Sequence, residues 1–199
     1  MSPTLVTFGT SAVTQNFTII IPADVAADID NICVKGTDVF GNVGPEVCVL
    51  AVWYDPSAGF VTGGGWIDSP AGAYTADPLL AGRANFGFVS KYQKGKTLPS
   101  GNTEFQFKAG DLAFKSTSME WLVVSGARAH FKGAGTINGV GGYTFMLTAI
   151  EGQISGGGGT DKFRIRIWNT GLVYDNMLNA PDTSDPTTLL GGGNIMIHK

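Results

Sequence analysis

The chain alternates strictly between polar and apolar side chains in the stretch Lys162-Phe163-Arg164-Ile165-Arg166-Ile167-Trp168. Successive side chains of a β-strand point to opposite sides, so Phe163, Ile165 and Ile167 share one face of an extended segment. The two arginines and Trp168 share the other face. A helix would instead need apolar residues three or four positions apart, so this stretch predicts a half-buried β-strand.

The same period of two recurs on both sides of this strand. It is found in residues 84–92, 103–108 and 143–149, and Ile195 and Ile197 repeat it near the C-terminus. Turn-forming residues separate such segments every ~8–12 residues, as in all-β folds. We therefore expect an all-β protein, an antiparallel β-sandwich or jelly roll with roughly eight or nine strands after residue 58.

The composition supports the all-β prediction. The 199 residues include 29 glycines, 12 phenylalanines, 5 tyrosines and 4 tryptophans, whereas only 15% of them are charged. Aromatic residues favour strands, and glycine favours the tight turns between them. A disordered chain would carry more charge and fewer aromatic residues.

Two segments are expected in the chain, with a junction at residues 55–59. The β-branched run 17–21 ends at Pro22, and a second run ends at Asp55-Pro56. Residues 1–55 thus supply three or four strands, which is too few for a full immunoglobulin-like sandwich. We expect a short, partial immunoglobulin-like unit in residues 1–55 and the main β-sandwich domain in residues 56–199.

Cys33 and Cys48 are the only cysteines of the chain. Placing them opposite each other in an antiparallel hairpin gives favourable cross-strand pairs, namely Ile32 with Val49, Val34 with Val47 and Lys35 with Glu46. We therefore predict a disulfide, which indicates an oxidising compartment. The alternative is a pair of buried free thiols.

Four stretches of the chain resemble a known module: residues 54–67, 84–92, 161–168 and 191–199. They are similar to a C-terminal module of bacterial secreted proteins that follows immunoglobulin-like repeats of the polycystic-kidney or hyalin type. Residues 17–53 look like the last strands of such a repeat. The resemblance implies an extracellular or cell-surface location and a sandwich architecture rather than an activity. This chain lacks the long repeat array, so either it is a fragment or another chain completes its N-terminal unit.

Catalytic motifs are scarce in this sequence. The two histidines are His130, in the middle of an expected strand, and His198, the penultimate residue, and there is no Gly-x-Ser-x-Gly elbow. No pair among the four glutamates stands out as the two facing carboxylates of a glycosidase. The glycine runs lack the Lys-Ser/Thr sequence of a phosphate loop. The sequence therefore predicts that the protein is not an enzyme.

A carbohydrate site is one alternative for function. The alternation places Trp168 outward beside Arg164 and Arg166, and with Lys91 these residues would suit an acidic polysaccharide. Tyr92, Trp66 and Trp121 are further candidates, although most aromatic residues of a sandwich lie in its core.

Four oxygen-bearing residues suggest a structural calcium ion. Asp175, Asn176, Asp182 and Asp185 lie in one polar loop region, and Ca²⁺ prefers clustered carboxylate and amide oxygens. The alternative is that these side chains form Asx turns. No other cofactor is expected, since two histidines and two bridged cysteines do not form a zinc site.

The charge distribution is asymmetric. Residues 1–80 carry a net charge of −7, whereas residues 81–166 carry +6, within an overall net charge of −3. Such polarity usually reflects solvated faces of opposite sign, and it would also suit steering of an acidic ligand or docking between copies of the chain. Nucleic acid is not expected as a partner, because the chain is acidic overall and has no known nucleic-acid motif. No apolar run is long enough for a membrane span.

The segment that includes Phe17, Ile19 and Ile21 is a candidate assembly strand. It is apolar on both faces, as in a strand buried within a sheet, and it could add to the sheet of a neighbouring chain. The alternative is that it packs within its own chain. The sequence thus favours a non-catalytic extracellular structural or adhesive protein, with other copies of itself or a neighbouring surface protein as partners.

Overall fold

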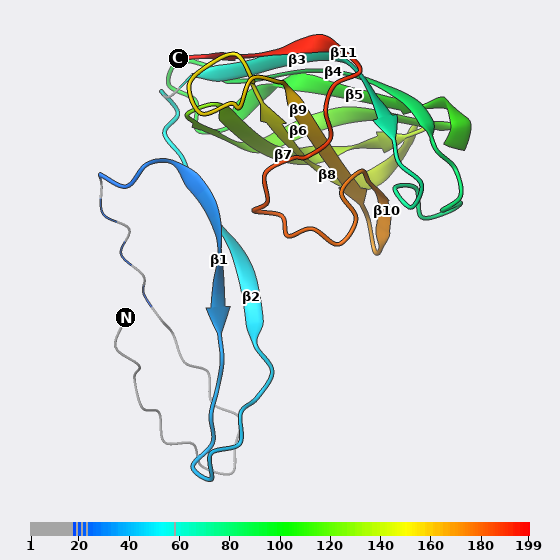
Figure 1. Cartoon of the computed structure of the whole chain (residues 1–199). Coiled ribbons are helices and arrows are strands. Elements are labelled where there is room, and N and C mark those ends of the chain that lie inside the picture. The colour runs from blue at the N-terminus through cyan, green and yellow to red at the C-terminus, as the bar shows by residue number, and fades with distance from the viewer. Residues whose placement is uncertain (1–17, 19, 21, 23, 58) are drawn as a thin grey trace.

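The structure, a computed structural model, describes residues 18, 20, 22, 24–57 and 59–199. These residues form a two-stranded hairpin and a nine-stranded antiparallel sheet (Figure 1). The hairpin consists of β1 (Asp28–Val34) and β2 (Val47–Trp53). The sheet contains β3 (Phe60–Ser69), β4 (Gly82–Tyr92), β5 (Pro99–Phe107), β6 (Leu112–Ser125), β7 (Arg128–Ile137), β8 (Val140–Ile150), β9 (Lys162–Trp168), β10 (Leu172–Asp175) and β11 (Gly192–His198). A short 3-10 helix, η1 (Lys108–Gly110), precedes β6. The predicted all-β antiparallel sandwich is confirmed.

The nine strands follow the order β10-β9-β8-β7-β6-β5-β4-β3-β11, and the sheet folds over on itself (Figure 1). Aromatic rings from strands far apart in this order therefore meet in the core. The ring of Phe86 in β4 stacks on Phe163 in β9 at 4.0 Å, and Phe105 in β5 lies 4.7 Å from Tyr174 in β10. One layer thus contains β11, β3, β4 and β5, and the other contains β7 to β10.

Strand β6 connects the two layers. It pairs with β5 only from Leu112 to Lys115, and its register with β7 then shifts at two irregularities. Such bulges bend a strand and increase its twist. Tyr92 at the end of β4 reaches β6 beyond this bend, since its hydroxyl donates to the carbonyl of Leu122 at 3.1 Å and accepts from its amide at 3.0 Å. Burial raises the pKa of Tyr92 to about 12.

The core lies between the two layers. The alternation of β9 is confirmed there, since Phe163, Ile165 and Ile167 are fully buried. The other large buried side chains of the core come from both layers: Ile67, Phe105, Phe107, Phe114, Leu122, Phe131, Phe145, Leu147 and Tyr174.

The strands near both ends of the sheet order have further hydrogen-bond partners. Tyr74, in the connection between β3 and β4, forms a bridge with Tyr174 of β10. The amide of Phe163 in β9 donates to the carbonyl of Thr188 at 2.9 Å. The amide of Ile195 in β11 donates to the side-chain carboxylate of Asp161 at 2.7 Å. These contacts occupy backbone groups that an open edge would leave unpaired.

The predicted register of the N-terminal hairpin is confirmed. Cys33 lies opposite Cys48 and forms a disulfide with it, and the flanking pairs are Ile32 with Val49 and Val34 with Val47. The ladder ends at Val34, one residue before the predicted pair of Lys35 with Glu46. The hairpin projects away from the nine-stranded sheet (Figure 1). Phe17, Ile19 and Ile21, the predicted assembly strand, lie outside the described residues.

Candidate functional site

Several of the predicted ligand and metal residues lie around the outer face of β9: Arg164, Arg166, Trp168, Asp175, Asn176 and Asp182. Arg164 and Arg166 point away from the core because Phe163, Ile165 and Ile167 point into it. The segment that follows β10 crosses this face. Arg164 donates to the carbonyls of Ala180 at 2.9 Å and Pro181 at 2.7 Å, so this segment covers the outward side of the strand.

Arg164 is a buried structural residue. Only 1% of its surface is exposed, and its guanidinium donates to both carboxylate oxygens of Asp175, at 3.0 and 2.8 Å. Two buried charges in such paired geometry satisfy each other. Arg164 therefore does not face solvent as the alternation suggested, because alternation shows which face of the sheet a residue occupies but not what covers that face.

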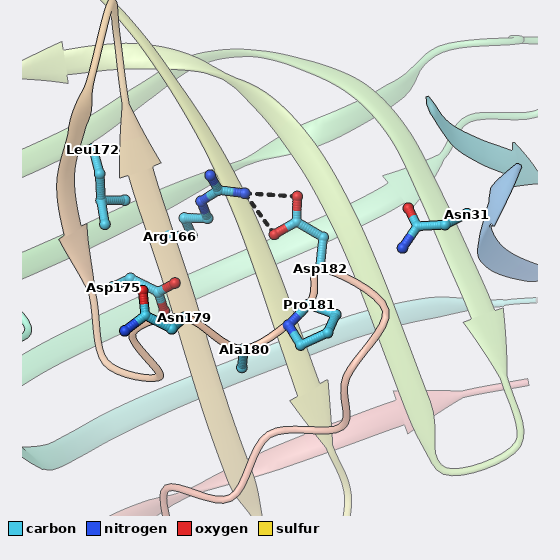
Figure 2. A pocket seen from close by; sticks show the side chains of 8 residues that line it. All are labelled: Asn31, Arg166, Leu172, Asp175, Asn179, Ala180, Pro181 and Asp182. Carbon is cyan, nitrogen blue, oxygen red and sulfur yellow. Dashed lines mark hydrogen bonds and ion pairs between the residues drawn. The ribbon is translucent and has the colours of Figure 1, made fainter. Parts of the chain in front are cut away.

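Arg166 and Trp168 lie further along the same face. Arg166 donates to both oxygens of Asp182 at 2.7 Å (Figure 2), and its guanidinium lies 5.1 Å from the ring centre of the half-buried Trp168. Arg166 and Asp182 line a shallow pocket of about 360 Å³ with Leu172 and with Asn31 of β1. The pocket is polar and open, but its arginine is already neutralised by a carboxylate.

Lys91 does not join this group. It lies on β4 opposite Phe60 and Ser100, on the outer face of the other layer. Since Phe86 of β4 meets Phe163 of β9 across the core, the outer faces of these two strands point in opposite directions. The four residues predicted to bind an acidic polysaccharide are thus not brought together.

The predicted calcium ligands do not converge either. Asp175 pairs with Arg164, Asp182 with Arg166, and Asp185 with Arg128 at 3.0 Å. Each carboxylate is therefore held by its own arginine: Arg164 and Arg166 lie two residues apart on β9, whereas Arg128 lies on β7. In the part of the chain that the structure describes, the one group of three candidate metal-ligating side chains is Cys33, Glu46 and Cys48, and its cysteines form the disulfide.

Asn176 is also engaged within the protein. Its amide oxygen accepts from the backbone of Ile165 at 2.8 Å, and its amide nitrogen donates to the carbonyl of Phe163 at 2.9 Å and to Thr188 at 2.8 Å. The side chain thus continues the ladder beside β9, where β10 has ended. The predicted set of Asp175, Asn176, Asp182 and Asp185 thus makes contacts within the protein that fix the covering segment to the sheet.

A row of four buried side chains crosses the same outer face and was not predicted. Val123, His130, Thr148 and Arg164 lie opposite one another on β6, β7, β8 and β9, and each is at most 1% exposed. Nδ1 of His130 lies 3.0 Å from the hydroxyl of Thr148. Burial lowers the pKa of His130 to about 3, so the imidazole is neutral. No sequence signal distinguishes this histidine from a solvent-facing residue of a strand.

Within the described ranges, no helix has the length and apolar character needed to cross a membrane. No protein-family model, no curated protein and no solved structure matches this chain.

Proposed function

We propose that this protein is a non-catalytic, extracellular structural or adhesive module that joins neighbouring copies of itself or another surface protein by strand addition. The acceptor is the β1–β2 hairpin, and the donor is the apolar segment around Phe17, Ile19 and Ile21 of a neighbouring chain. Residues 1–55 would in this way form a partial immunoglobulin-like unit that another chain completes.

The exposed apolar face of the hairpin carries this proposal. Val34, Val47 and Val49 are 52%, 64% and 62% exposed, and with Ile32 they form one face of the two-stranded ladder. Isolated two-stranded hairpins are marginal in water and gain stability from further strands. Among the residues that the structure describes, neither β1 nor β2 pairs with a third strand.

The disulfide supports an extracellular location. Disulfides persist in oxidising compartments, and this one cross-links the hairpin that we propose as the acceptor. It would hold the two strands in register and so preserve an edge to which another strand can add.

The chemistry of the described residues favours binding over catalysis. The imidazole of His130 is buried, and the ring of His198 stacks on Phe60 at 4.1 Å. The carboxylates around β9 are each paired with an arginine. Neither arrangement offers a base positioned beside a nucleophile.

An association experiment tests the proposal. Sedimentation velocity over a range of protein concentrations should show oligomers of the native chain, and Val47→Lys with Val49→Lys should abolish them. A synthetic peptide of residues 15–22 should compete with the association. Leu79→Lys is the matched control, because Leu79 is an apolar residue that is 89% exposed outside the hairpin. A strictly monomeric native chain would remove the assembly role.

A further inference from the structure

The outer face of β11, β3, β4 and β5 carries an array of uncharged polar side chains. Because Phe86, Phe88 and Phe105 point into the core, the residues that alternate with them point outward. In one row across the strands, Asn194 lies opposite Gly64, and Gly64 lies opposite Gly87. In the neighbouring row of outward residues, Asn85 lies opposite Gln106. Asn102 follows on β5, two residues before Glu104.

Two glycines form a hollow at the centre of this face. Gly64 and Gly87 are direct cross-strand partners, and neither has a positive φ. A Cβ on Gly87 would have no atom within 4 Å, and one on Gly64 would make only an ordinary contact at 3.8 Å. Neither the backbone nor the packing therefore requires glycine, although glycine weakens a strand. The hollow beside Gly87 has a volume of about 250 Å³ and is lined by Asn85, Glu104 and Gln106.

The carboxamides around the hollow have no hydrogen-bond partners within the described part of the protein. The side-chain hydrogen bonds of this layer involve other groups, such as Tyr92 and Ser100. Asn85, Gln106 and Asn194 therefore keep their donors and acceptors available. They are spread over three strands of the sheet, β11, β4 and β5.

One charged pair lies beside the hollow, where Glu104 lies 3.4 Å from Lys115. The basic residues Arg83 and Lys91 lie on the same outward face toward the two ends of β4, and the guanidinium of Arg83 lies 4.3 Å from the ring centre of Trp66. The hollow between these two residues is bordered mainly by uncharged amides, which suit a neutral ligand, whereas a protein interface would need an apolar centre.

Aromatic side chains flank the face along β3. Trp66 is half-buried at one end, and Phe60 stacked on His198 lies at the other. Phe60 and Trp66 are six positions apart along the strand, which corresponds to ~20 Å. A polar floor with aromatic borders suits an elongated ligand whose hydroxyl groups bind amides and whose carbon-bound hydrogens contact rings.

We propose that this face binds a neutral polysaccharide, with a sugar ring seated over Gly64 and Gly87 and its hydroxyl groups bound by Asn85, Gln106 and Asn194. The site is separate from the β1–β2 hairpin and from the predicted site at Trp168. It would give the module a ligand that is independent of its association with other chains.

Affinity electrophoresis of the native chain tests this site. The gels contain either a neutral polysaccharide (xyloglucan, mixed-linkage β-glucan, galactomannan or arabinoxylan) or an anionic one (alginate or polygalacturonate). At least one neutral gel should retard the protein. Gly87→Val places a side chain in the hollow without a clash, and it should weaken that retardation at least tenfold. The double variant Asn85→Ala with Gln106→Ala should weaken the retardation to the same extent. Trp168→Ala and Val49→Lys should leave it unchanged.

The thermal unfolding midpoint serves as the control for correct folding. Gly87→Val should preserve or raise this midpoint, because valine favours strands. The proposal is overturned if no neutral gel retards the native chain, or if Gly87→Val binds as well as the native chain does. Retardation in the anionic gels alone, lost on replacing Arg83 and Lys91 of this face, would also overturn it. Val49→Lys changes the hairpin and leaves this face intact. Its association and its binding to polysaccharide can therefore be measured separately, and the assembly proposal can fail without affecting the binding result.

Discussion

Arg128 of β7 holds Asp28 at the start of β1 through an ion pair, and thereby attaches the hairpin to the nine-stranded sheet. The same guanidinium donates to Asp185 at 3.0 Å, in the segment that covers the outer face of β9. One side chain thus joins three parts of the chain that are distant in sequence. Since Arg128 is only about a quarter exposed, this attachment is partly shielded from solvent.

Replacing Arg128 by glutamine should loosen the base of the hairpin. We expect faster amide hydrogen exchange in β1 and a loss of about 1 kcal/mol in the free energy of unfolding, because the two carboxylates lose a partly shielded partner. Lys132→Gln is the control, since it breaks a pair with Glu120 that lies within the sheet. Unchanged exchange at Ile29 in the Arg128 variant would show that other contacts hold the hairpin.

The ion pair of Arg164 with Asp175 should be the most costly one to break. Arg164→Met leaves the Asp175 carboxylate buried without its partner, and such a loss costs about 3–5 kcal/mol. The double variant with Asp175→Leu should recover much of this loss, because it removes the unpaired charge. Chemical denaturation of the two single variants and the double variant measures the coupling. Purely additive effects would mean that the pair is not coupled in the folded protein.

His130 should make the protein sensitive to acid. Its pKa is about 3 in the folded protein and about 6.5 in an unfolded chain, so between these values only the unfolded chain binds the proton. The free energy of unfolding therefore falls as the pH falls below 6.5, by about 1.4 kcal/mol per pH unit from this group. His130→Gln should remove that part of the slope. Denaturation curves at pH 7.5, 6 and 5 test it, and equal slopes for both proteins would contradict it.

The strands and the hairpin register could be predicted because both depend on local patterns. Alternation in β9 identified Phe163, Ile165 and Ile167 as core residues, and the spacing of the two cysteines fixed the pairs around the disulfide. These inferences need only the pleat of a strand and the identity of its direct neighbours.

The candidate site could not be predicted in the same way, because it depends on which segments meet in space. Arg164 looks like a solvent-facing residue until the segment at Ala180 and Pro181 covers it. Asp182 and Asp185 look like calcium ligands until arginines from β9 and β7 neutralise them. Long-range pairing of this kind leaves no period in the sequence.

Removing the disulfide should destabilise the hairpin and leave the sheet intact. Cys33 and Cys48 are 15 residues apart in sequence, and closing a loop of that size is worth about 3 kcal/mol in the chain-entropy model. A two-stranded ladder with an exposed apolar face has little else to hold it, so Cys33→Ser with Cys48→Ser should abolish amide protection at Ile32 and Val49.

The sheet should respond differently, because its core lies between its own two layers and does not include the hairpin disulfide. Amides of β8, such as that of Leu147, should keep their protection in the double serine variant, and the main thermal transition should move by no more than a few degrees. Hydrogen exchange read by mass spectrometry separates the two segments in one experiment. A matching loss of protection in β8 would mean that hairpin and sheet unfold as a single cooperative unit.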